Sequence, residues 1–132
     1  MPEGDPYFLP VLEKAKILNK LTDGALNTSV APLVNYWGFG YKGKDEITNV
    51  DSIAVDSILA LVNQSSFELI KKDEGSYINK SIPKAEIDFS SLAKGYGIDV
   101  IAAFLDAQHV ENYLIDIGGE ARAKGKNSMD VP

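Results

Sequence analysis

The sequence predicts an α+β fold in which helices pack on a mainly antiparallel sheet. Three stretches carry apolar residues at steps of three and four, the spacing of a buried helix face. Short apolar runs bounded by turn residues lie after the second of these stretches and again after the third, and such runs are typical of strands. The chain has 132 residues, of which 45% are hydrophobic and 24% charged. These values suit one globular domain or part of one.

The N-terminal part is predicted to contain a tail, two helices and an intervening loop. Residues 1–7 form the tail, rich in proline, glycine and acids, and a partial domain is predicted over 8–132. Apolar spacing from Phe8 to Leu21 predicts the first helix. From Thr22 to Gly43, glycines and a proline interrupt apolar residues without any period, which is typical of an irregular segment and a candidate ligand-binding loop. The second helix is predicted over 51–63, with its first residue as the N-cap.

The remaining elements are predicted to be strands around a third helix. Three short strand candidates come first: Phe67–Ile70, Ser76–Asn79 and Ala85–Phe89. The first two flank a charged loop and are predicted to form a hairpin. A longer helix is predicted from Ser90 to Ala107, because a serine can cap it and its apolar residues form one stripe. An apolar strand follows at Tyr113–Ile117, and Glu120–Ala123 begins its predicted partner.

Composition and charge exclude several classes of protein. A net charge of −6 argues against a nucleic-acid binder, which needs a cationic surface to release counterions from phosphates. No apolar run approaches the roughly 20 residues that span a bilayer. The absence of cysteine removes disulfides, thiolate nucleophiles and cysteine-ligated zinc. A multi-histidine metal site is excluded because His109 is the only histidine, and its place after the third helix does not favour a catalytic base. The first five residues lack the basic and apolar regions of a signal peptide.

The junction from Asp88 to Gly97 is the most informative stretch. A strand candidate delivers a carboxylate, two serines lie at the start of a helix, and Lys94 follows in its first turn. Free N–H groups at a helix N-terminus beside a lysine can hold a phosphate or pyrophosphate. Gly95 and Gly97 each cost the helix on the order of 1 kcal/mol relative to alanine, which indicates close approach of another backbone or a ligand. The structural alternative is an ordinary serine cap, a solvated lysine and glycines that serve helix–sheet packing.

Two further stretches are candidates for ligand contact. Small, flexible and hydroxylated residues between Thr22 and Val30 suit a loop that closes over a flat ligand, with Trp37 and Phe39 near it. The alternative is a loop whose aromatic residues are simply buried in the core. The pair Gly118-Gly119 at the end of a strand permits close approach of a ligand, or forms a bulge or turn.

Together these segments resemble the ApbE family of FAD:protein FMN transferases, formerly called thiamine biosynthesis lipoproteins. Three blocks carry the resemblance, in the family's order and spacing: Thr22-Asp23-Gly24-Ala25 through Pro32-Leu33-Val34 to Trp37-Gly38-Phe39-Gly40; Ile87-Asp88 with Ala93-Lys94-Gly95-Tyr96 and Asp99; and Ile117-Gly118-Gly119-Glu120. The resemblance runs from about Phe8 to Gly125.

The resemblance implies a magnesium-dependent reaction. FAD is cleaved at its pyrophosphate, FMN is attached through a phosphoester to a threonine or serine of a target protein, and AMP is released. The resemblance also implies that Ala25, Leu26 and Asn27 contact FAD, and that Asp88 and Lys94 contact the flavin nucleotide. Ser91 matches a position that ligates magnesium, in some members through its backbone carbonyl. The family usually has aspartate at the position of Asn27.

The resemblance further implies that the C-terminal half of the family's domain lies outside this chain. That half would carry a catalytic histidine segment and the aspartate and threonine that complete the magnesium site, so no catalytic residue is assigned here. We therefore expect this chain alone to be inactive and to self-associate through an exposed sheet edge. By family, the protein is expected to be a lipoprotein on the periplasmic side of the bacterial inner membrane. The alternatives are a non-catalytic flavin-binding module and an interaction domain of the same family.

Overall fold

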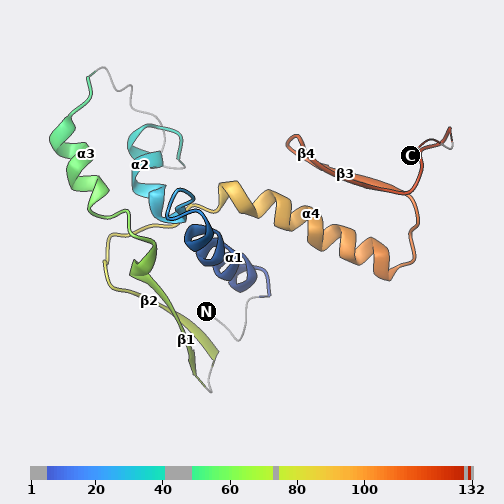
Figure 1. Ribbon diagram of the computed structural model, residues 1–132, viewed down its shortest axis with the longest axis horizontal. Coiled ribbons are helices and arrows are strands. Elements are labelled where there is room, and N and C mark those ends of the chain that lie inside the picture. Colours follow the sequence, from blue (N-terminus) through green and yellow to red (C-terminus); the bar gives the residue numbers. More distant parts are fainter. Residues whose placement is uncertain (1–5, 41–48, 73–74, 130, 132) are drawn as a thin grey trace. The chain divides into compact units, whose positions relative to one another are not determined.

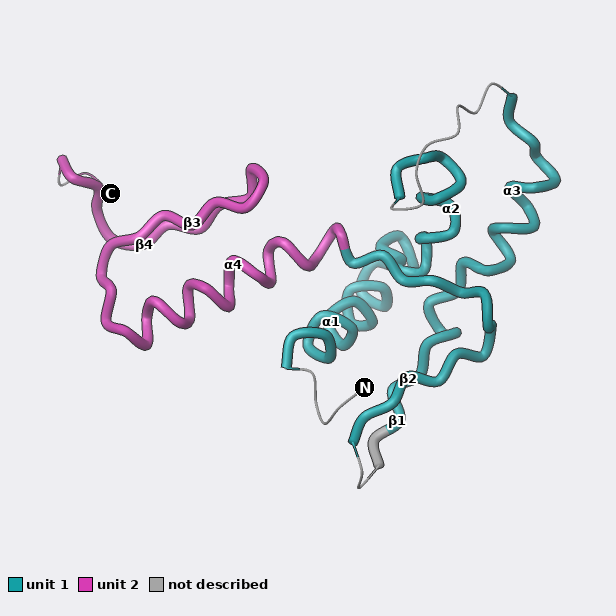
Figure 2. The backbone as a smooth tube through the Cα atoms, turned by 180° about the vertical axis from the view of Figure 1, so that it is seen from behind, with its two compact units in different colours: residues 1–89 teal, residues 90–132 magenta. Residues whose placement is uncertain are grey.

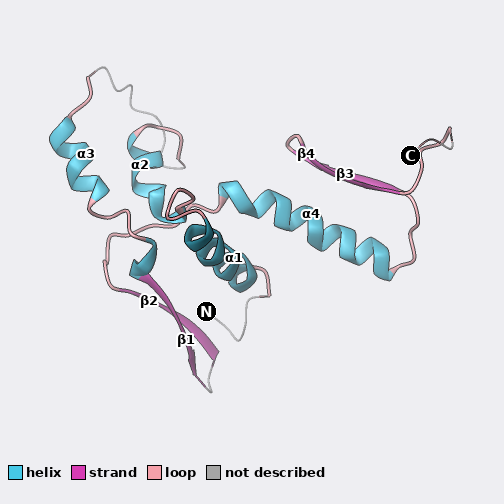
Figure 3. Ribbon diagram, in the orientation of Figure 1, coloured by secondary structure: helices cyan, strands magenta, loops and turns pink. Residues whose placement is uncertain are grey.

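The structure is a computed structural model that describes residues 6–40, 49–72, 75–129 and 131. The chain divides into two compact units, residues 1–89 (unit 1) and 90–132 (unit 2), drawn in different colours in Figure 2. Unit 1 combines several helices, and unit 2 one helix, with an antiparallel hairpin (Figures 1 and 3), which confirms the predicted α+β class. The described strands form two separate two-stranded sheets. No helix in the described ranges is long and apolar enough to cross a membrane.

Unit 1 begins with helix α1, which has the predicted bounds, Phe8–Leu21. Its buried residues Val11, Leu12 and Ala15 form one face, as the spacing predicts. The helix ends where Gly24, with φ +87°, donates its N–H to the Asn19 carbonyl at 2.8 Å. A glycine adopts this left-handed conformation without the steric cost of a side chain.

The prediction of an irregular segment after α1 is wrong in part, because it contains a short helix. A 3₁₀ turn, η1 (Thr28–Val30), leads directly into α2 (Ala31–Tyr36). Pro32 lies in the first turn of α2, where a helix residue needs no N–H donor and a fixed φ is favourable. Six residues make less than two turns, so they show no periodicity that sequence analysis can detect.

Helix α3 (Ser52–Leu59) is shorter than the predicted range of 51–63. Asp51 is its N-cap, as predicted, because its carboxylate accepts hydrogen bonds from the backbone N–H groups of Ile53 and Ala54. The end of the predicted range forms a second cap instead. There Asn63 accepts from the Ser65 N–H and begins the 3₁₀ turn η2 (Gln64–Ser66).

The hairpin of unit 1 pairs β1 (Phe67–Lys72) with β2 (Gly75–Lys80), as predicted, and Phe67 is buried. The third strand candidate of this region, Ala85–Phe89, is wrong: the structure assigns it no strand. Its backbone N–H at Asp88 donates to the Thr28 carbonyl at 2.7 Å. The alternating apolar residues of this segment therefore reflect packing of a non-strand segment beside the loop that contains Thr28, with Ala85 fully buried.

Unit 2 consists of α4 (Ser90–Ala107) and the hairpin of β3 (Tyr113–Ile117) and β4 (Glu120–Lys124). Helix α4 and strand β3 have the predicted bounds. Their core contains Ile98, Ala102 and Ile115, with Leu105, Tyr113 and Ile117 packed against it. Gly118 and Gly119 form the hairpin turn with φ +60° and +88°, values typical of the turn that joins two twisted strands. The glycine pair is therefore a turn, one of the alternatives that its sequence allows.

Candidate functional site

The loop after α1, which the sequence singles out as a ligand contact, is held by hydrogen bonds from α1. The N–H groups of Ala25 and Leu26 donate to the carbonyl and the hydroxyl of Thr22, both at 3.0 Å. The Leu26 carbonyl accepts from the side-chain amide of Asn19 at 2.8 Å. Ala25 is exposed and Leu26 is half-buried. The loop therefore has a fixed backbone with an accessible outer residue.

The side chain of Asn27 bonds within this loop. Its Oδ1 accepts from the Ser29 backbone N–H at 3.0 Å and from the Ser29 hydroxyl at 2.6 Å. Ser29 is fully buried, so this pair anchors the loop at the start of η1. Both bonds use only an acceptor oxygen, and an aspartate could accept them equally well. The asparagine at this position therefore changes the charge of the loop while the loop keeps its cap.

Gln64 completes the support of the loop, and sequence analysis did not identify it. Its Oε1 accepts from the Thr28 N–H at 3.0 Å and from the Thr28 hydroxyl at 2.9 Å. Gln64 is 8% exposed and Thr28 is 2% exposed, so both hydrogen bonds are buried. The Gln64 Nε2 is buried without a partner among the described residues. No signal in the sequence connects two residues that lie 36 positions apart.

The first sequence block meets the start of the second, Ile87-Asp88, within unit 1. The hydrogen bond from the Asp88 N–H to the Thr28 carbonyl joins the segment before α4 to the loop of the first block. A second link joins the same regions, since the Asn35 amide donates to Glu86 Oε2 at 2.8 Å. Asp88 is half-buried. The structure therefore brings Asp88 beside the loop that contains Ala25, Leu26 and Asn27, as a shared ligand site requires.

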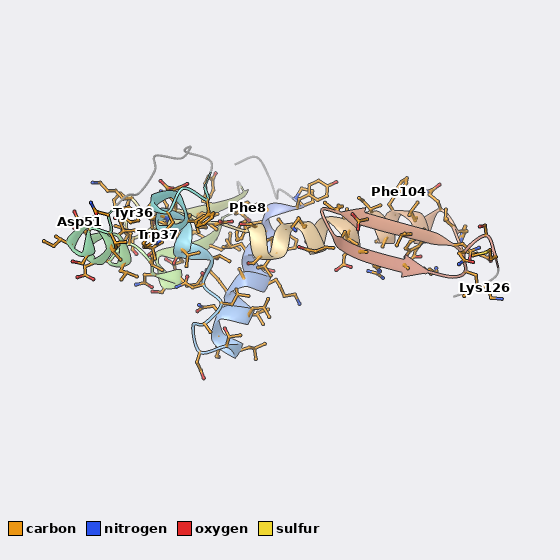
Figure 4. All side chains as sticks on the ribbon, turned by 90° about the horizontal axis from the view of Figure 1, so that it is seen from above. Phe8, Tyr36, Trp37, Asp51, Phe104 and Lys126 are labelled. Atoms are coloured by element: carbon orange, nitrogen blue, oxygen red, sulfur yellow. The ribbon has the colours of Figure 1, made fainter. Side chains whose placement is uncertain are left out.

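The alternative interpretation of the first block predicts that its aromatic residues are buried in the core, but Trp37 and Phe39, which follow α2, are exposed. Trp37 is 39% exposed and Phe39 is 83% exposed. Tyr36 and Trp37 contact each other edge to face with ring centroids 5.3 Å apart, and both are labelled in Figure 4. The Tyr36 hydroxyl accepts from the Asp51 N–H at 3.3 Å. This end of the first block therefore presents aromatic surface to its surroundings.

In unit 2, the second and third blocks meet. The Lys94 ammonium forms an ion pair with Glu120 at 2.8 Å, and both side chains are a little under half exposed. A Cβ added to Gly95 would lie 3.5 Å from Glu120 Oε2, and one added to Gly97 would lie 3.8 Å from Ile117 Cδ1. Both distances are ordinary van der Waals contacts. An alanine would therefore fit at either position, and packing inside unit 2 does not require these two glycines.

Two other ion pairs of unit 2 shift the pKa values of Asp106, Arg122 and Lys124. The hydrogen bond from Lys124 holds the pKa of the Asp106 carboxyl below its ordinary value, and the same bond raises the pKa of Lys124. The hydrogen bond to Asp99 raises the pKa of Arg122. These exposed pairs attach β4 to α4.

The described residues do not form a magnesium site by themselves. Ser91, the predicted ligand, is exposed at the second position of α4. Mg²⁺ prefers carboxylate, phosphate and water oxygens in octahedral geometry. The described parts of the chain contain no group of three or more histidine, aspartate or glutamate side chains that could hold an ion. The structure therefore places the predicted residues in two groups: the loop and Asp88 in unit 1, Ser91 and Lys94 in unit 2.

Comparison with known proteins gives a consistent result. A sequence model described as the ApbE family matches residues 3–131. The chain is 40% identical over 124 residues to the FAD:protein FMN transferase of Vibrio cholerae serotype O1, covering 94% of this chain and 36% of that protein. It is 40% identical over 125 residues to the FAD:protein FMN transferase of Haemophilus influenzae, covering 95% of this chain and 36% of that protein. The chain thus spans about a third of the length of these curated relatives.

Solved structures agree with the sequence matches. A mutant form of the flavin transferase ApbE from Vibrio cholerae has a TM-score of 0.86 at 38% identity, covering 98% of this chain and 43% of that one. The flavinyl transferase ApbE of Pseudomonas stutzeri, in its apo form, has a TM-score of 0.77 at 28% identity, covering 93% of this chain and 37% of that one.

Proposed function

Because the chain belongs to the ApbE family, as its three sequence blocks predict, we propose that it is the N-terminal and central part of an FAD:protein FMN transferase. The relatives that are similar to it in sequence have this name, and each is about three times as long as this chain. The proposed substrates are FAD and a target protein that receives FMN. The contribution of this chain is to bind the flavin nucleotide, and the transfer step needs residues beyond those present here.

The proposed reaction transfers the FMN phosphoryl group from FAD to a hydroxyl group. The oxygen of a threonine or serine in the target protein forms a bond to the FMN phosphorus, and the bond from that phosphorus to the bridging pyrophosphate oxygen breaks. The hydroxyl proton is lost and AMP leaves. Such a reaction depends on positioning and on stabilisation of charge at the phosphates. Magnesium would supply part of that stabilisation. The described residues do not form its site, so no step is assigned to a metal here.

The hydrogen bond between the Asp88 N–H and the Thr28 carbonyl is the observation that supports a flavin site in this chain. It holds Asp88 beside Thr28, next to the loop of the first sequence block. The loop bearing Ala25 and Asn27 is itself fixed by Thr22, Asn19 and Gln64. A loop held by hydrogen bonds of this kind has less conformational entropy to lose when a ligand binds. In this proposal Lys94 contributes a positive charge for the pyrophosphate.

Titration with FAD, with and without magnesium, tests the proposal. The full-length gene product and this chain alone are titrated in parallel, and binding is followed by flavin fluorescence. We expect the full-length protein to bind FAD and to transfer FMN to a threonine-containing target, and to fail with an alanine in place of that threonine. We expect the chain alone to be inactive in transfer.

A substitution with a matched control locates the site. We expect Asp88→Asn to weaken FAD binding about tenfold, the value of one hydrogen bond involving a charged group. The control is Asp56→Asn, which removes one exposed carboxylate from α3. Unchanged FAD affinity in Asp88→Asn would overturn the site assignment. A full-length protein that neither binds FAD nor labels a target with FMN would overturn the proposed function.

A further inference from the structure

We propose that Glu120 is a positioning residue for Lys94, holding the Lys94 ammonium group in place for the phosphates of the bound flavin nucleotide. This inference rests on the proposed function, in which Lys94 contacts those phosphates. It assigns a role to a side chain at the start of β4, in the third sequence block, for which the resemblance implies no ligand contact.

The contact itself is direct and accessible. Lys94 Nζ lies 2.8 Å from Glu120 Oε1, and the two side chains are 44% and 45% exposed. An ammonium group has three N–H donors, so a single carboxylate leaves donors for a second acceptor. Partial exposure allows an anionic ligand to approach the same ammonium group. Glu120 can therefore orient Lys94 and remain bound to it while a phosphate binds.

The backbone of the β3–β4 turn builds this arrangement. Gly118 adopts a φ of +60°, and a Cβ added there would lie 3.8 Å from Lys94 Cδ and 3.9 Å from Nζ. The aliphatic part of Lys94 therefore packs along the turn. Glu120, Arg122 and Lys124 alternate along β4 opposite Ile117, Ile115 and Tyr113, so their side chains share the sheet face that packs on α4. The turn thus delivers the Glu120 carboxylate to the beginning of α4.

Stability alone does not explain the signs of these two charges. The pairs Asp99–Arg122 and Asp106–Lys124 have the acid on α4 and the base on β4, whereas Lys94–Glu120 has the base on α4. An acidic residue near the start of a helix is favoured by the helix dipole, and a basic one is not. An exchange of the two side chains would therefore preserve the ion pair and improve its interaction with the helix. A requirement for a cation at position 94 accounts for the observed order.

A charge-swap variant separates positioning from structure. Lys94→Glu combined with Glu120→Lys is made in the full-length gene product, and stability is measured by urea unfolding. Affinity is measured with two probes, FAD and inorganic pyrophosphate. We expect the urea midpoint to be kept or slightly raised, since the ion pair is preserved and the acidic residue now lies near the helix start. Both dissociation constants should rise at least about tenfold, since the cation at position 94 is lost. Restored affinity in the swapped protein would overturn the proposal, because any ion pair would then be sufficient.

Single substitutions test the role of Glu120 itself. We expect Glu120→Gln to weaken FAD binding roughly threefold to tenfold, which corresponds to the cost of ordering one flexible side chain. Glu120→Asp, which keeps the carboxylate, is expected to restore part of this loss. In transfer assays KM should rise while kcat is kept, because an interaction present in both ground and transition state is removed. The matched control is Asp106→Asn, which breaks the exposed pair with Lys124 and should leave KM unchanged.

The comparison in a Lys94→Met background completes the test. Glu120→Gln should have no further effect there, because Glu120 acts through Lys94. Tighter FAD binding in Glu120→Gln, or an equal loss with and without Lys94, would overturn the proposal. A wild-type protein that binds pyrophosphate through Lys94 and Glu120 but does not bind FAD would overturn the proposed function, while the role of Glu120 in positioning Lys94 for a phosphate ligand would stand. A wild-type protein that binds FAD, with the same FAD affinity in every Glu120 variant, would overturn the inference and leave the proposed function standing.

Discussion

The buried contact between Gln64 and Thr28 provides the sharpest test of how the loop after α1, the candidate flavin contact, is supported. Replacing Gln64 with leucine keeps the approximate size of the side chain and removes the oxygen that accepts from the Thr28 N–H and hydroxyl. Both donors are buried, since Thr28 is 2% exposed. Each buried donor left without a partner costs about 1–3 kcal/mol. The hydroxyl can rotate to lessen its share, so we expect a loss of roughly 2–4 kcal/mol in the free energy of unfolding.

Urea unfolding of the full-length gene product measures this loss, with two variants as comparisons. Gln64→Glu keeps an oxygen that can accept from the Thr28 N–H. It should therefore be destabilised less than Gln64→Leu at low pH, where its carboxyl is neutral and no charge is buried. Thr28→Val removes the hydroxyl but keeps the N–H, so it should cost about 1 kcal/mol. The double variant Gln64→Leu with Thr28→Val should cost less than the sum of the two, because the residues share one interaction.

The result that refutes this reasoning is a Gln64→Leu protein destabilised by less than about 0.5 kcal/mol, the scatter of ordinary surface substitutions. Such a protein would mean that the two donors find other partners, and the loop would not depend on Gln64. We also expect Gln64→Leu to weaken FAD binding although Gln64 is 8% exposed, because the loop loses its fixed position. If Gln64→Leu caused a large loss of stability and left the FAD affinity unaltered, Gln64 would support the fold of unit 1 without affecting FAD binding.

Three further predictions concern the loop, the ion pairs of unit 2 and the helix glycines. Asn27→Ala removes the acceptor for Ser29 and should cost about 1 kcal/mol, whereas Asn27→Asp should keep that stability in thermal unfolding. Because the pKa of Asp106 is lowered in the folded state, its ion pair stabilises the protein above the ordinary aspartate pKa of 3.8. That contribution is lost as pH falls through the lower pKa of the folded state, so the urea midpoints of wild type and Asp106→Asn should converge as the solution is acidified below that pKa. Gly95→Ala should stabilise the protein by about 0.5–1 kcal/mol and weaken FAD binding.

The elements that sequence analysis predicts best are those that carry a long amphipathic stripe. Helices α1 and α4 have their predicted bounds, because each buries one face over several turns. Helix α2 was missed because six residues do not establish a period. Ala85–Phe89 was predicted as a strand because local apolar residues cannot reveal what pairs with their backbone. Its backbone partner is Thr28, far away in the sequence.

The candidate site divides in the same way between local and distant interactions. The Asp51 cap and the glycine turn at Gly118 are local, and their residue types predict them. The supports from Gln64 and from Glu120 act between residues far apart in the chain. A glutamine before a strand and a glutamate after a turn are ordinary surface residues by composition. Their roles follow only from the tertiary structure, because folding brings them against a loop and against the start of a helix.

The two glycines near the start of α4, Gly95 and Gly97, bear on whether a ligand approaches this helix. Their cost in a helix requires an explanation, and the sequence allows three: packing against the sheet, close approach of another backbone, or close approach of a ligand. At Gly95 and Gly97 an added Cβ would meet its nearest neighbours at 3.5 and 3.8 Å, distances that any alanine tolerates. The hairpin therefore does not demand glycine, and alanine would gain helix stability at no steric cost within unit 2. Since the packing explanation predicts a clash with the hairpin that unit 2 does not contain, the glycines near Lys94 favour close approach of a ligand or of another backbone to the start of α4.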